Sequence, residues 1–306
     1  MFKLKKYGGI VVALLMLVGM VGCGDGNEAG GSNDLSIQDR AGLDFVIPEE
    51  MDAIVSLAPS ITIILIDLGL EDQMVAIDSG SAFAIGNPND LPVFDMMAPE
   101  IESLIELEPD FVFASTMTVM DNVENDPFGS LRDLGIGVAY LPTSDSLDGI
   151  REDIRFIASV MGVVEAGEAL IAEMDRELEE IATLVYDREV PLMVYFEITP
   201  APEMFSFGSG VFLNEMLLLA GGSNVFSDLS DWLSVEAESV VSANPDVIFT
   251  NVNFIDDPVG EIMGRPGWEG MDAILNGRVY VIDNNDTSVP THRVVHAIRA
   301  MAEYLN

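Results

Sequence analysis

The sequence predicts an α/β fold in which two Rossmann-like lobes are joined by a single long helix. From about residue 44, short apolar runs alternate with longer segments of helical period, which is typical of βα units. Residues 146–187 contain no proline and keep helical periodicity throughout. In addition, "IESLIELEPDFVFAS" at 101–115 returns as "AESVVSANPDVIFTN" at 237–251, beyond that helical stretch. The repeat indicates that each lobe contains the same helix, Pro-Asp and strand unit.

The N-terminal lobe is predicted to span residues 44–145. Residues 53–58 have the composition of a buried strand, and the segment after them has helical spacing, with Ser60 as its N-cap and Gly69 as its end. Pro109 is expected to stop the short helix of the repeat. The remaining strands of this lobe are expected at 74–78, 111–115 and 138–142.

Residues 146–188 form the predicted connecting region, which Met161 and Gly162 divide into two helices. The second helix could run for about twenty residues, or about 30 Å. An ordinary crossover helix within one sheet is the alternative. The length of the helix, and the new start of βα units after it, favour a strut between two lobes.

The C-terminal lobe is predicted to span residues 189–306. It opens with a strand at 190–198, followed by a helix that begins after Gly-Ser-Gly at 208–210. The repeated helix and strand come next, then a strand at 278–283 and a last helix at about 291–305.

Residues 1–23 have the features of a lipoprotein signal peptide. Lys3, Lys5 and Lys6 precede an apolar stretch at 8–22 that is short for a membrane span. The sequence "MVGC" resembles a bacterial lipobox, in which Cys23 becomes the acylated first residue of the mature protein. An ordinary signal peptide with an incidental cysteine is the alternative. We expect a protein outside the cytoplasm, anchored by lipid to the cytoplasmic membrane, with residues 24–43 as a flexible, Gly-rich tether.

The chain is strongly acidic, with 13 Lys and Arg against 52 Asp and Glu and a formal charge of −39. All three lysines lie in the signal segment. Nucleic acid is therefore excluded as a partner, because phosphate binding needs a basic face. An acidic, lysine-free surface also suits high salt, which screens self-repulsion.

The sequence contains few side chains that could serve as catalytic groups. There are two histidines, and the one cysteine lies in the signal segment. The Gly-Ser-Gly at 208–210 lacks the third glycine of a dinucleotide-binding motif. His292 and His296 are spaced to share one helix face, but two imidazoles alone do not hold a metal. We expect no catalysis, no intrinsic cofactor and no metal bound directly by the protein.

Five segments together resemble the helical-backbone periplasmic binding proteins, the receptors of ABC importers for ferric siderophores, haem and cobalamin. They are "AIVSLAPSITIILIDLGL", "PEIESLIELEPDFVFAS", "GSGVFLNEMLLLAGGSNVF", "WLSVEAESVVSANPDVIF" and "RPGWEGMDAILNGRVYVID", and they occur in the family order. The resemblance as a whole extends over nearly all of residues 44–306. The resemblance implies a ligand cleft between the lobes and a monomeric protein that delivers its ligand to an ABC permease dimer with its ATPase subunits.

In that family, a glutamate on each lobe docks into arginine pockets of the two permease subunits. Glu102 and Glu238 match those positions, each seven residues before a Pro-Asp pair. An exposed carboxylate can accept a bidentate arginine fork, so two of them would fix orientation as well as affinity. The alternative is that each glutamate only complements a helix N-terminus, which contributes about 0.3–1 kcal/mol.

The cleft should be lined by loops at the carboxyl ends of the strands. An aromatic and thioether lining would suit a large, partly apolar chelate, although core packing is the alternative for each such side chain. The expected cleft residues are Pro59, Ser60, Met96, Met117, Glu197, Phe205, Phe207, Trp232, Asn253, His292 and Arg293.

One departure from the family bears on the ligand. Many relatives read Arg-Pro-Gly-Pro-Arg near the last helix, whereas this chain has "VPTHR", with Val289 in place of the first arginine. That change disfavours a strongly anionic catecholate. A neutral hydroxamate chelate or a corrinoid fits better, and haem remains open through His292 or Met117, so the ligand is expected to carry iron or cobalt. A surface sensor or adhesion module without a permease partner is the alternative function.

Overall fold

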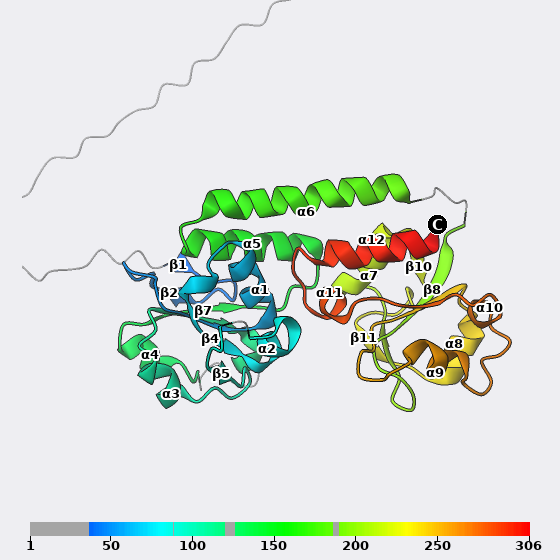
Figure 1. The fold of residues 1–306 in the computed structure, drawn as a ribbon, viewed down its shortest axis with the longest axis horizontal. Coiled ribbons are helices and arrows are strands. Elements are labelled where there is room, and N and C mark those ends of the chain that lie inside the picture. The colour runs from blue at the N-terminus through cyan, green and yellow to red at the C-terminus, as the bar shows by residue number, and fades with distance from the viewer. Residues whose placement is uncertain (1–36, 88, 120–125, 186–189) are drawn as a thin grey trace, which may run out of the picture. The chain divides into compact units, whose positions relative to one another are not determined.

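The structure is a computed structural model that describes residues 37–87, 89–119, 126–185 and 190–306. The signal peptide, Cys23 and tether residues 24–36 lie outside the described residues. Residues 35–306 form one compact unit. Its fold is mixed α/β with two parallel sheets, so the predicted fold class is confirmed (Figure 1).

The first lobe contains a parallel sheet of five strands in the order β5-β4-β3-β6-β7. Its strands are β3 (Ile54–Leu57), β4 (Met74–Asp78), β5 (Val93–Phe94), β6 (Phe111–Ser115) and β7 (Gly137–Leu141). Because side chains alternate along a strand, Phe111 and Phe113 join the core on one face, whereas Val112 joins the core on the other. Both faces are covered, which explains the nearly continuous apolar runs. The helices are α1 (Pro59–Asp67), α2 (Ser79–Ile85), α3 (Ile101–Glu106) and α4 (Gly129–Asp133).

Helix α1 begins two residues earlier than its predicted cap implied. Ser60 is not the N-cap: Ala58 occupies that position and Pro59 is the first helical residue. Proline suits this position because its ring fixes φ at a helical value and its missing N–H would have no partner inside the helix. The predicted end at Gly69 is confirmed, since its φ of +79° lies in the region that only glycine adopts readily.

Residues 37–43 were expected to belong to the tether, but they form part of the first lobe. Strands β1 (Ile37–Gln38) and β2 (Asp44–Phe45) pair as an antiparallel hairpin. Asp39, which is 7% exposed, accepts hydrogen bonds from the backbone N–H groups of Ala41, Leu43 and Tyr140. These bonds attach the hairpin to β7, so this part of the chain is folded.

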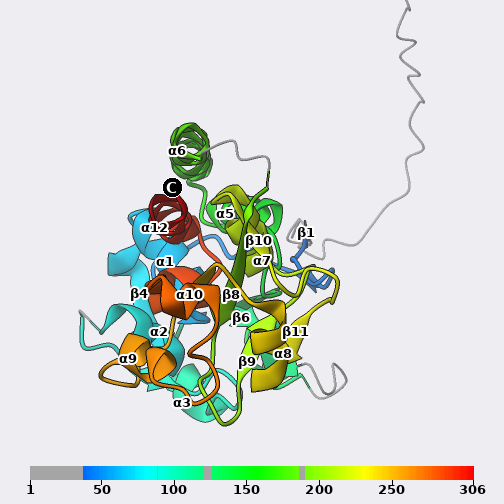
Figure 2. The same cartoon turned by 90° about the vertical axis from the view of Figure 1, so that its right-hand side faces the viewer.

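Two helices follow the first sheet, α5 (Leu147–Val160) and α6 (Val164–Leu184), and the predicted break at Met161 and Gly162 is confirmed. Helix α6 packs against α5 at one end and against α12 (Val294–Leu305) at the other (Figures 1 and 2). Ion pairs follow both contacts: Arg151 to Asp175 and Arg155 to Glu168 join α5 to α6, and Arg299 to Glu177 joins α12 to α6. The helix therefore packs against elements on both sides of it in the sequence, as a strut requires.

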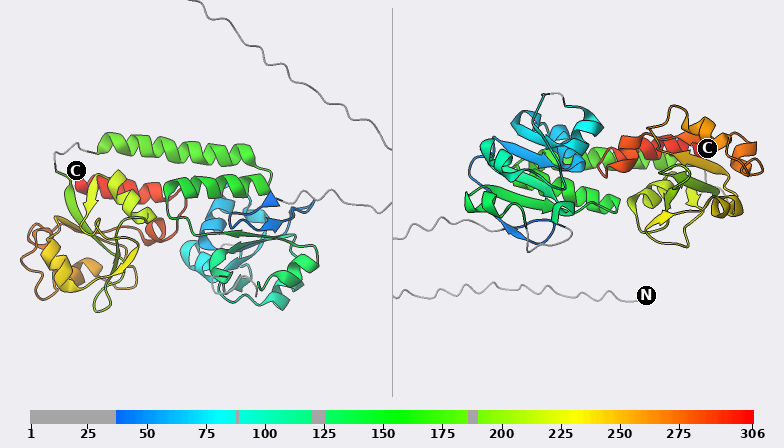
Figure 3. Two further views of the ribbon diagram at one scale, coloured as in Figure 1. Left: turned by 180° about the vertical axis from the view of Figure 1, so that it is seen from behind. Right: turned by 90° about the horizontal axis from the view of Figure 1, so that it is seen from below.

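The second lobe contains a parallel sheet of four strands in the order β10-β8-β12-β13 (Figure 3). Its strands are β8 (Leu192–Glu197), β10 (Gly222–Asn224), β12 (Val247–Thr250) and β13 (Val279–Val281). The sequence did not predict the antiparallel ribbon of β9 (Phe205–Phe207) and β11 (Trp232–Ser234). The helices are α7 (Phe212–Leu219), α8 (Ala237–Ala243), α9 (Pro258–Met263), α10 (Asp272–Leu275) and α11 (Asn284–Ser288).

The repeated sequence adopts the same structure in both lobes. In each copy a short helix ends before a residue of positive φ, Glu108 at +49° or Asn244 at +44°, which directly precedes the proline. Proline disfavours the helical region for the residue before it, so it enforces the end of the helix. The aspartate that follows then binds the neighbouring strand: Asp110 accepts the N–H of Ala53, and Asp246 accepts the N–H of Met193.

One apolar cluster contains side chains from both sheets. It includes one face of each sheet together with buried residues of α1, α5, α6, α7 and α12. The outer face of each sheet has a separate cluster of its own. Within the described ranges, no helix combines the length and apolar character that a membrane span needs.

Candidate functional site

A pocket of about 160 Å³ lies at the carboxyl ends of the strands of the first sheet. This edge of a parallel sheet is where ligands bind in open α/β folds. Helix α1 contributes its first turn, and single residues follow β5 and β6. Four predicted cleft residues therefore meet here: Pro59, Ser60, Met96 and Met117.

The remaining walls come from two segments that sequence reasoning missed. One is Leu141–Thr143, which follows β7, and the other is Ser288–Pro290, which follows α11. Val289, the residue that departs from the family sequence, is part of this second wall. A signal for the first segment was available, since it too follows a strand end. No local pattern predicts that residues 288–290 return to the first sheet.

Among the residues that the structure describes, no charged side chain lines this pocket. Its apolar part includes two thioethers and an isoleucine, and hydroxyl groups come from Ser60, Ser115, Thr143 and Ser288. The loops are locally fixed: the hydroxyl of Thr118 donates to the carbonyl of Met96 at 2.8 Å, and the N–H of Met117 donates to the hydroxyl of Ser115 at 3.1 Å. The lining suits a neutral, partly apolar surface that also accepts a few hydrogen bonds.

Trp232 presents a half-exposed indole on the ribbon of the second lobe, with an exposed fraction of 46%. Its ring makes edge contacts with Phe207 and Phe212, with 6.4 Å between ring centroids in each case. Phe207 is fully buried, so it supports the indole and is not itself a cleft residue. Phe205 is partly buried on the same strand, and Asn253 is exposed in the loop after β12.

Glu197 does not line a cleft, although it ends β8 as predicted. Its carboxylate is 1% exposed and accepts both guanidinium nitrogens of Arg265, at 2.5 and 2.8 Å. Burial raises the pKa of Glu197, and the bonds from Arg265 oppose that rise. Arg265 in turn lies over the ring of Trp268, 4.6 Å from its centroid. The sequence could not predict this pairing, because the two charges are 68 residues apart.

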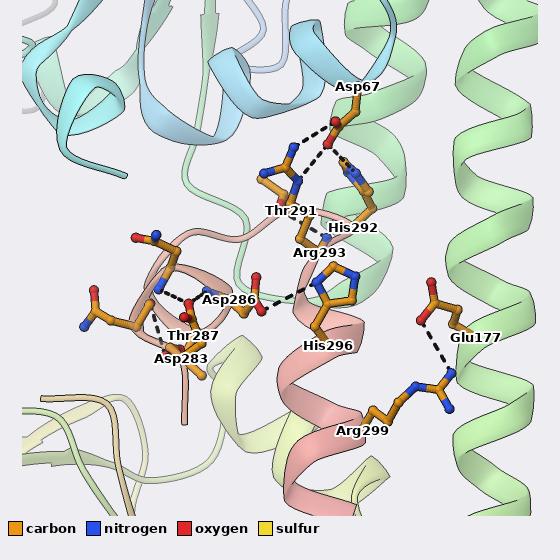
Figure 4. A network of polar contacts seen from close by, with 12 residues as sticks. Asp67, Glu177, Asp283, Asp286, Thr287, Thr291, His292, Arg293, His296 and Arg299 are labelled. Atoms are coloured by element: carbon orange, nitrogen blue, oxygen red, sulfur yellow. Dashed lines mark hydrogen bonds and ion pairs between the residues drawn. The ribbon is translucent and has the colours of Figure 1, made fainter. Parts of the chain in front are cut away.

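His292 and Arg293 also have a partner other than a ligand. Both bind the carboxylate of Asp67, the last residue of α1: His292 Nε2 lies 2.8 Å from Oδ2, and two nitrogens of Arg293 donate at 2.8 Å each (Figure 4). Neither side chain lines the pocket. The other ring nitrogen of His292 is buried without a hydrogen-bond partner, so neither nitrogen is presented to an axial ligand position.

His296 faces a different carboxylate, that of Asp286, with Nδ1 and Oδ2 at 3.5 Å (Figure 4). The two histidines therefore do not converge on one point. In the part of the chain that the structure describes, no group of three or more His, Cys, Asp or Glu side chains is placed to hold a metal ion.

Glu102 and Glu238 occupy equivalent positions in the two lobes. Each is the second residue of its helix, α3 or α8, and each side chain is exposed. Neither carboxylate has a hydrogen bond or ion pair with any described residue. Both are therefore free to accept donors from another protein, and both also lie where a negative charge complements a helix N-terminus.

The fold agrees with the comparison to known families. The sequence matches the periplasmic binding protein family over residues 54–285, so the chain belongs to that family. It is a family of extracytoplasmic substrate-binding proteins of transport systems, not of enzymes.

Particular relatives carry more specific descriptions. The chain is 28% identical to YvrC of Bacillus subtilis strain 168, an uncharacterized ABC transporter substrate-binding lipoprotein, over 98% of this chain and 97% of that protein. It is 26% identical to the vitamin B12-binding protein of Vibrio cholerae, over 84% and 90% respectively. A crystal structure of a possible iron-binding periplasmic solute-binding protein from Staphylococcus epidermidis superimposes with a TM-score of 0.71, at 25% identity, over 83% of this chain and 98% of that one.

Proposed function

We propose that this protein captures an uncharged metal chelate, either a ferric siderophore of the hydroxamate type or a corrinoid, and delivers it to an ABC permease. The observation that carries the proposal is the uncharged pocket lined by Met96 and Met117. The half-exposed indole of Trp232 is an aromatic surface on the other lobe. Thioether and aromatic groups make favourable contacts with a large, partly apolar ligand. The relatives that bind vitamin B12 or iron support the same class.

The distribution of arginine argues against an anionic ligand. No arginine lines the pocket, and a formal charge of −39 repels anions at low salt. Most of the arginines are held by carboxylates of the protein: Arg40, Arg132, Arg151, Arg155, Arg176, Arg265, Arg293 and Arg299. Haem held through His292 receives no support, because His292 is bound to Asp67 and does not line the pocket, so of the two residues considered for haem only Met117 is in the pocket.

Titration of the purified full chain in detergent tests the ligand class. The chain has two tryptophans, and Trp268 is 1% exposed. A ligand in the cleft should therefore quench mainly Trp232, and the control variant Trp232→Phe should lose most of that signal. We expect binding of a ferric hydroxamate or of cobinamide, and no binding of molybdate or of a ferric catecholate. Binding of only the anionic ligands, or of none of the four, would reject the proposed chelate class.

The same proposal assigns Glu102 and Glu238 to permease docking. Replacing both with alanine should reduce uptake into cells at least about tenfold, since each could contribute charge-assisted bonds to an arginine. Ligand affinity of the purified protein should not change. Glu106→Ala with Glu203→Ala is a matched control, because these glutamates are also exposed, one in each lobe.

Normal uptake in the docking variant would favour the alternative of a sensor or adhesion module without a permease. Weakened ligand binding would instead place the glutamates in the cleft. The membrane anchor is a separate part of the proposal and rests on Cys23: Cys23→Ser should release the protein into the medium, and continued retention in the membrane fraction would contradict it.

A further inference from the structure

The last residue of α11 and the five residues after it contact both ends of helix α1. We call residues 288–293 the connecting segment. Its first half, Ser288–Pro290, forms a wall of the pocket beside Pro59 and Ser60 at the start of α1. Its second half ends in His292 and Arg293, which bind Asp67 at the end of α1. The segment belongs to the second lobe by sequence, yet Asp67, which its side chains bind, belongs to the first lobe.

The contact at Asp67 is the stronger of the two attachments to the first lobe. Arg293 binds both carboxylate oxygens, and His292 shares one of them (Figure 4). Burial by itself would raise the pKa of Asp67, but the bonds from His292 and Arg293 outweigh it and lower the pKa to about 2. Two parallel bonds between a guanidinium and a carboxylate fix orientation as well as distance.

A second set of bonds holds α11, which precedes the segment. Asn285 Nδ2 donates to the carbonyl oxygen of Ala84 in α2 at 2.8 Å. From the second lobe, Asn251 Nδ2 donates to the hydroxyl groups of Thr287 and Ser288, at 3.0 and 3.3 Å. These amide bonds hold the start of the segment, so the ion pair at Asp67 is what fixes its far end.

We infer that Asp67 is a positioning residue for ligand binding, holding the pocket wall Ser288–Pro290 in place through His292 and Arg293. It touches no ligand itself, since neither it nor its two partners line the pocket. Loss of the carboxylate would let the wall move away from α1, so the bound chelate would leave faster. The identity of the ligand in this inference rests on the proposed function. The position of the pocket wall does not depend on it.

The decisive variant is Asp67→Asn, which has the same shape but replaces an acceptor oxygen by a donor and removes the charge. Backbone hydrogen exchange over residues 288–293 should become faster in the unliganded full chain. Dissociation of cobinamide or ferric hydroxamate, followed by Trp232 fluorescence, should become about tenfold faster. The association rate should change less than threefold, because changes of affinity within one site act mainly on the dissociation rate.

Arg299→Gln is the matched control, because Arg299 also joins α12 to carboxylates of another helix and lines no pocket. It should leave both readouts unchanged. Asp67→Glu should restore slow dissociation in part, since it returns the charge. Arg293→Gln combined with Asp67→Asn should have no larger effect than either alone, as expected for two partners of one contact.

The outcomes separate this inference from the proposed function. Unchanged exchange over 288–293 in Asp67→Asn overturns the inference, whatever the ligand. An equal effect of Arg299→Gln on dissociation also overturns it, because the effect would then reflect general stability. If the unaltered protein binds none of the chelates, the proposed function fails, and the exchange measurement still decides whether Asp67 fixes the wall.

Discussion

The two lobes contain the same repeated unit, yet they bury charge in opposite ways. In the first lobe Asp78 is fully buried and forms no ion pair with a described residue. Its carboxylate accepts from the N–H and the hydroxyl of Ser81, and that hydroxyl is hydrogen-bonded to Thr62, which is in turn hydrogen-bonded to Ser56. In the second lobe the buried carboxylate, Glu197, is paired with Arg265. Both lobes keep the exposed glutamate, the positive-φ residue and the Pro-Asp pair. The shared unit therefore fixes the scaffold, and the elements around it have diverged.

The pocket reflects this divergence. Most of its lining comes from the first lobe, where α1 begins directly after β3. The second lobe has the β9–β11 ribbon with Trp232, to which nothing in the described part of the first lobe corresponds. A ligand held between such surfaces would meet thioethers and hydroxyls on one side and an indole on the other.

The largest effect on stability is expected at the charge pair of the second lobe. Arg265→Met leaves the carboxylate of Glu197 buried without a cation, which should lower the free energy of unfolding by about 3–5 kcal/mol. Urea denaturation measures it. Adding Glu197→Met should recover part of the loss, because the double variant buries no charge. A loss below about 1 kcal/mol in Arg265→Met would mean that the second lobe does not depend on its pair.

An intermediate effect is expected at the two repeated aspartates, and it should differ between the lobes. Asp110 accepts two backbone N–H groups, those of Asp52 and Ala53, whereas Asp246 accepts one. A hydrogen bond to a charged group contributes about 1.5–3 kcal/mol, so Asp110→Ala should destabilise more than Asp246→Ala. Asp133→Ala, at an exposed position, is the control for thermal unfolding. Equal losses would show that the second bond of Asp110 adds nothing.

The smallest effect is expected at Asp78, and it depends on pH. Burial raises the pKa of Asp78, so the folded state binds the proton more tightly than the unfolded state does. Its contribution to stability is thus full below the unfolded value of 3.8 and is lost as pH rises through the folded value. Asp78→Asn should remove this slope, since an amide can donate to Ser81 instead.

Asp67 is a control for the pH measurement, because its contribution to the free energy of unfolding changes with pH in the opposite direction. Its pKa is lowered from 3.8 to about 2, so its contribution is present above 3.8 and is lost as pH falls towards 2. Asp67→Asn should therefore reduce the pH dependence of the free energy of unfolding below pH 3.8. Asp78→Asn should instead reduce that dependence above pH 3.8. The same sign in both variants would contradict the burial argument for Asp78.

Local patterns in the sequence predicted the longer strands of both sheets but not the short edge strands β5 and β10, because apolar periodicity and turn residues act within one element and need several residues to show. Met74–Asp78 is a strand with the predicted bounds, and Gly162 separates α5 from α6. The strand-end rule also placed Pro59, Ser60 and Met117 at one edge of the first sheet, where they line one pocket together with Met96. Ser60 was wrong as an N-cap because the signal of a proline at the first helical position was overlooked.

The errors at the site share one physical cause. Glu197, His292 and Arg293 lie near strand or helix ends, as predicted, but each is bound by a charge that is distant in sequence. The partner of Arg293, for example, is 226 residues away. A single sequence shows which side chains can form an ion pair but not which ones do, so free and paired charges cannot be told apart until the fold brings them together.

The apolar cluster that contains one face of each sheet also has a consequence for unfolding. Because α5, α6, α7 and α12 contribute buried side chains to that one cluster, neither lobe has an inner face that is complete by itself. Exposing the inner face of one sheet would remove contacts that the helices of the other lobe need. Heat should therefore melt residues 37–306 in one cooperative transition, with equal calorimetric and van't Hoff enthalpies, although the chain builds two sheets.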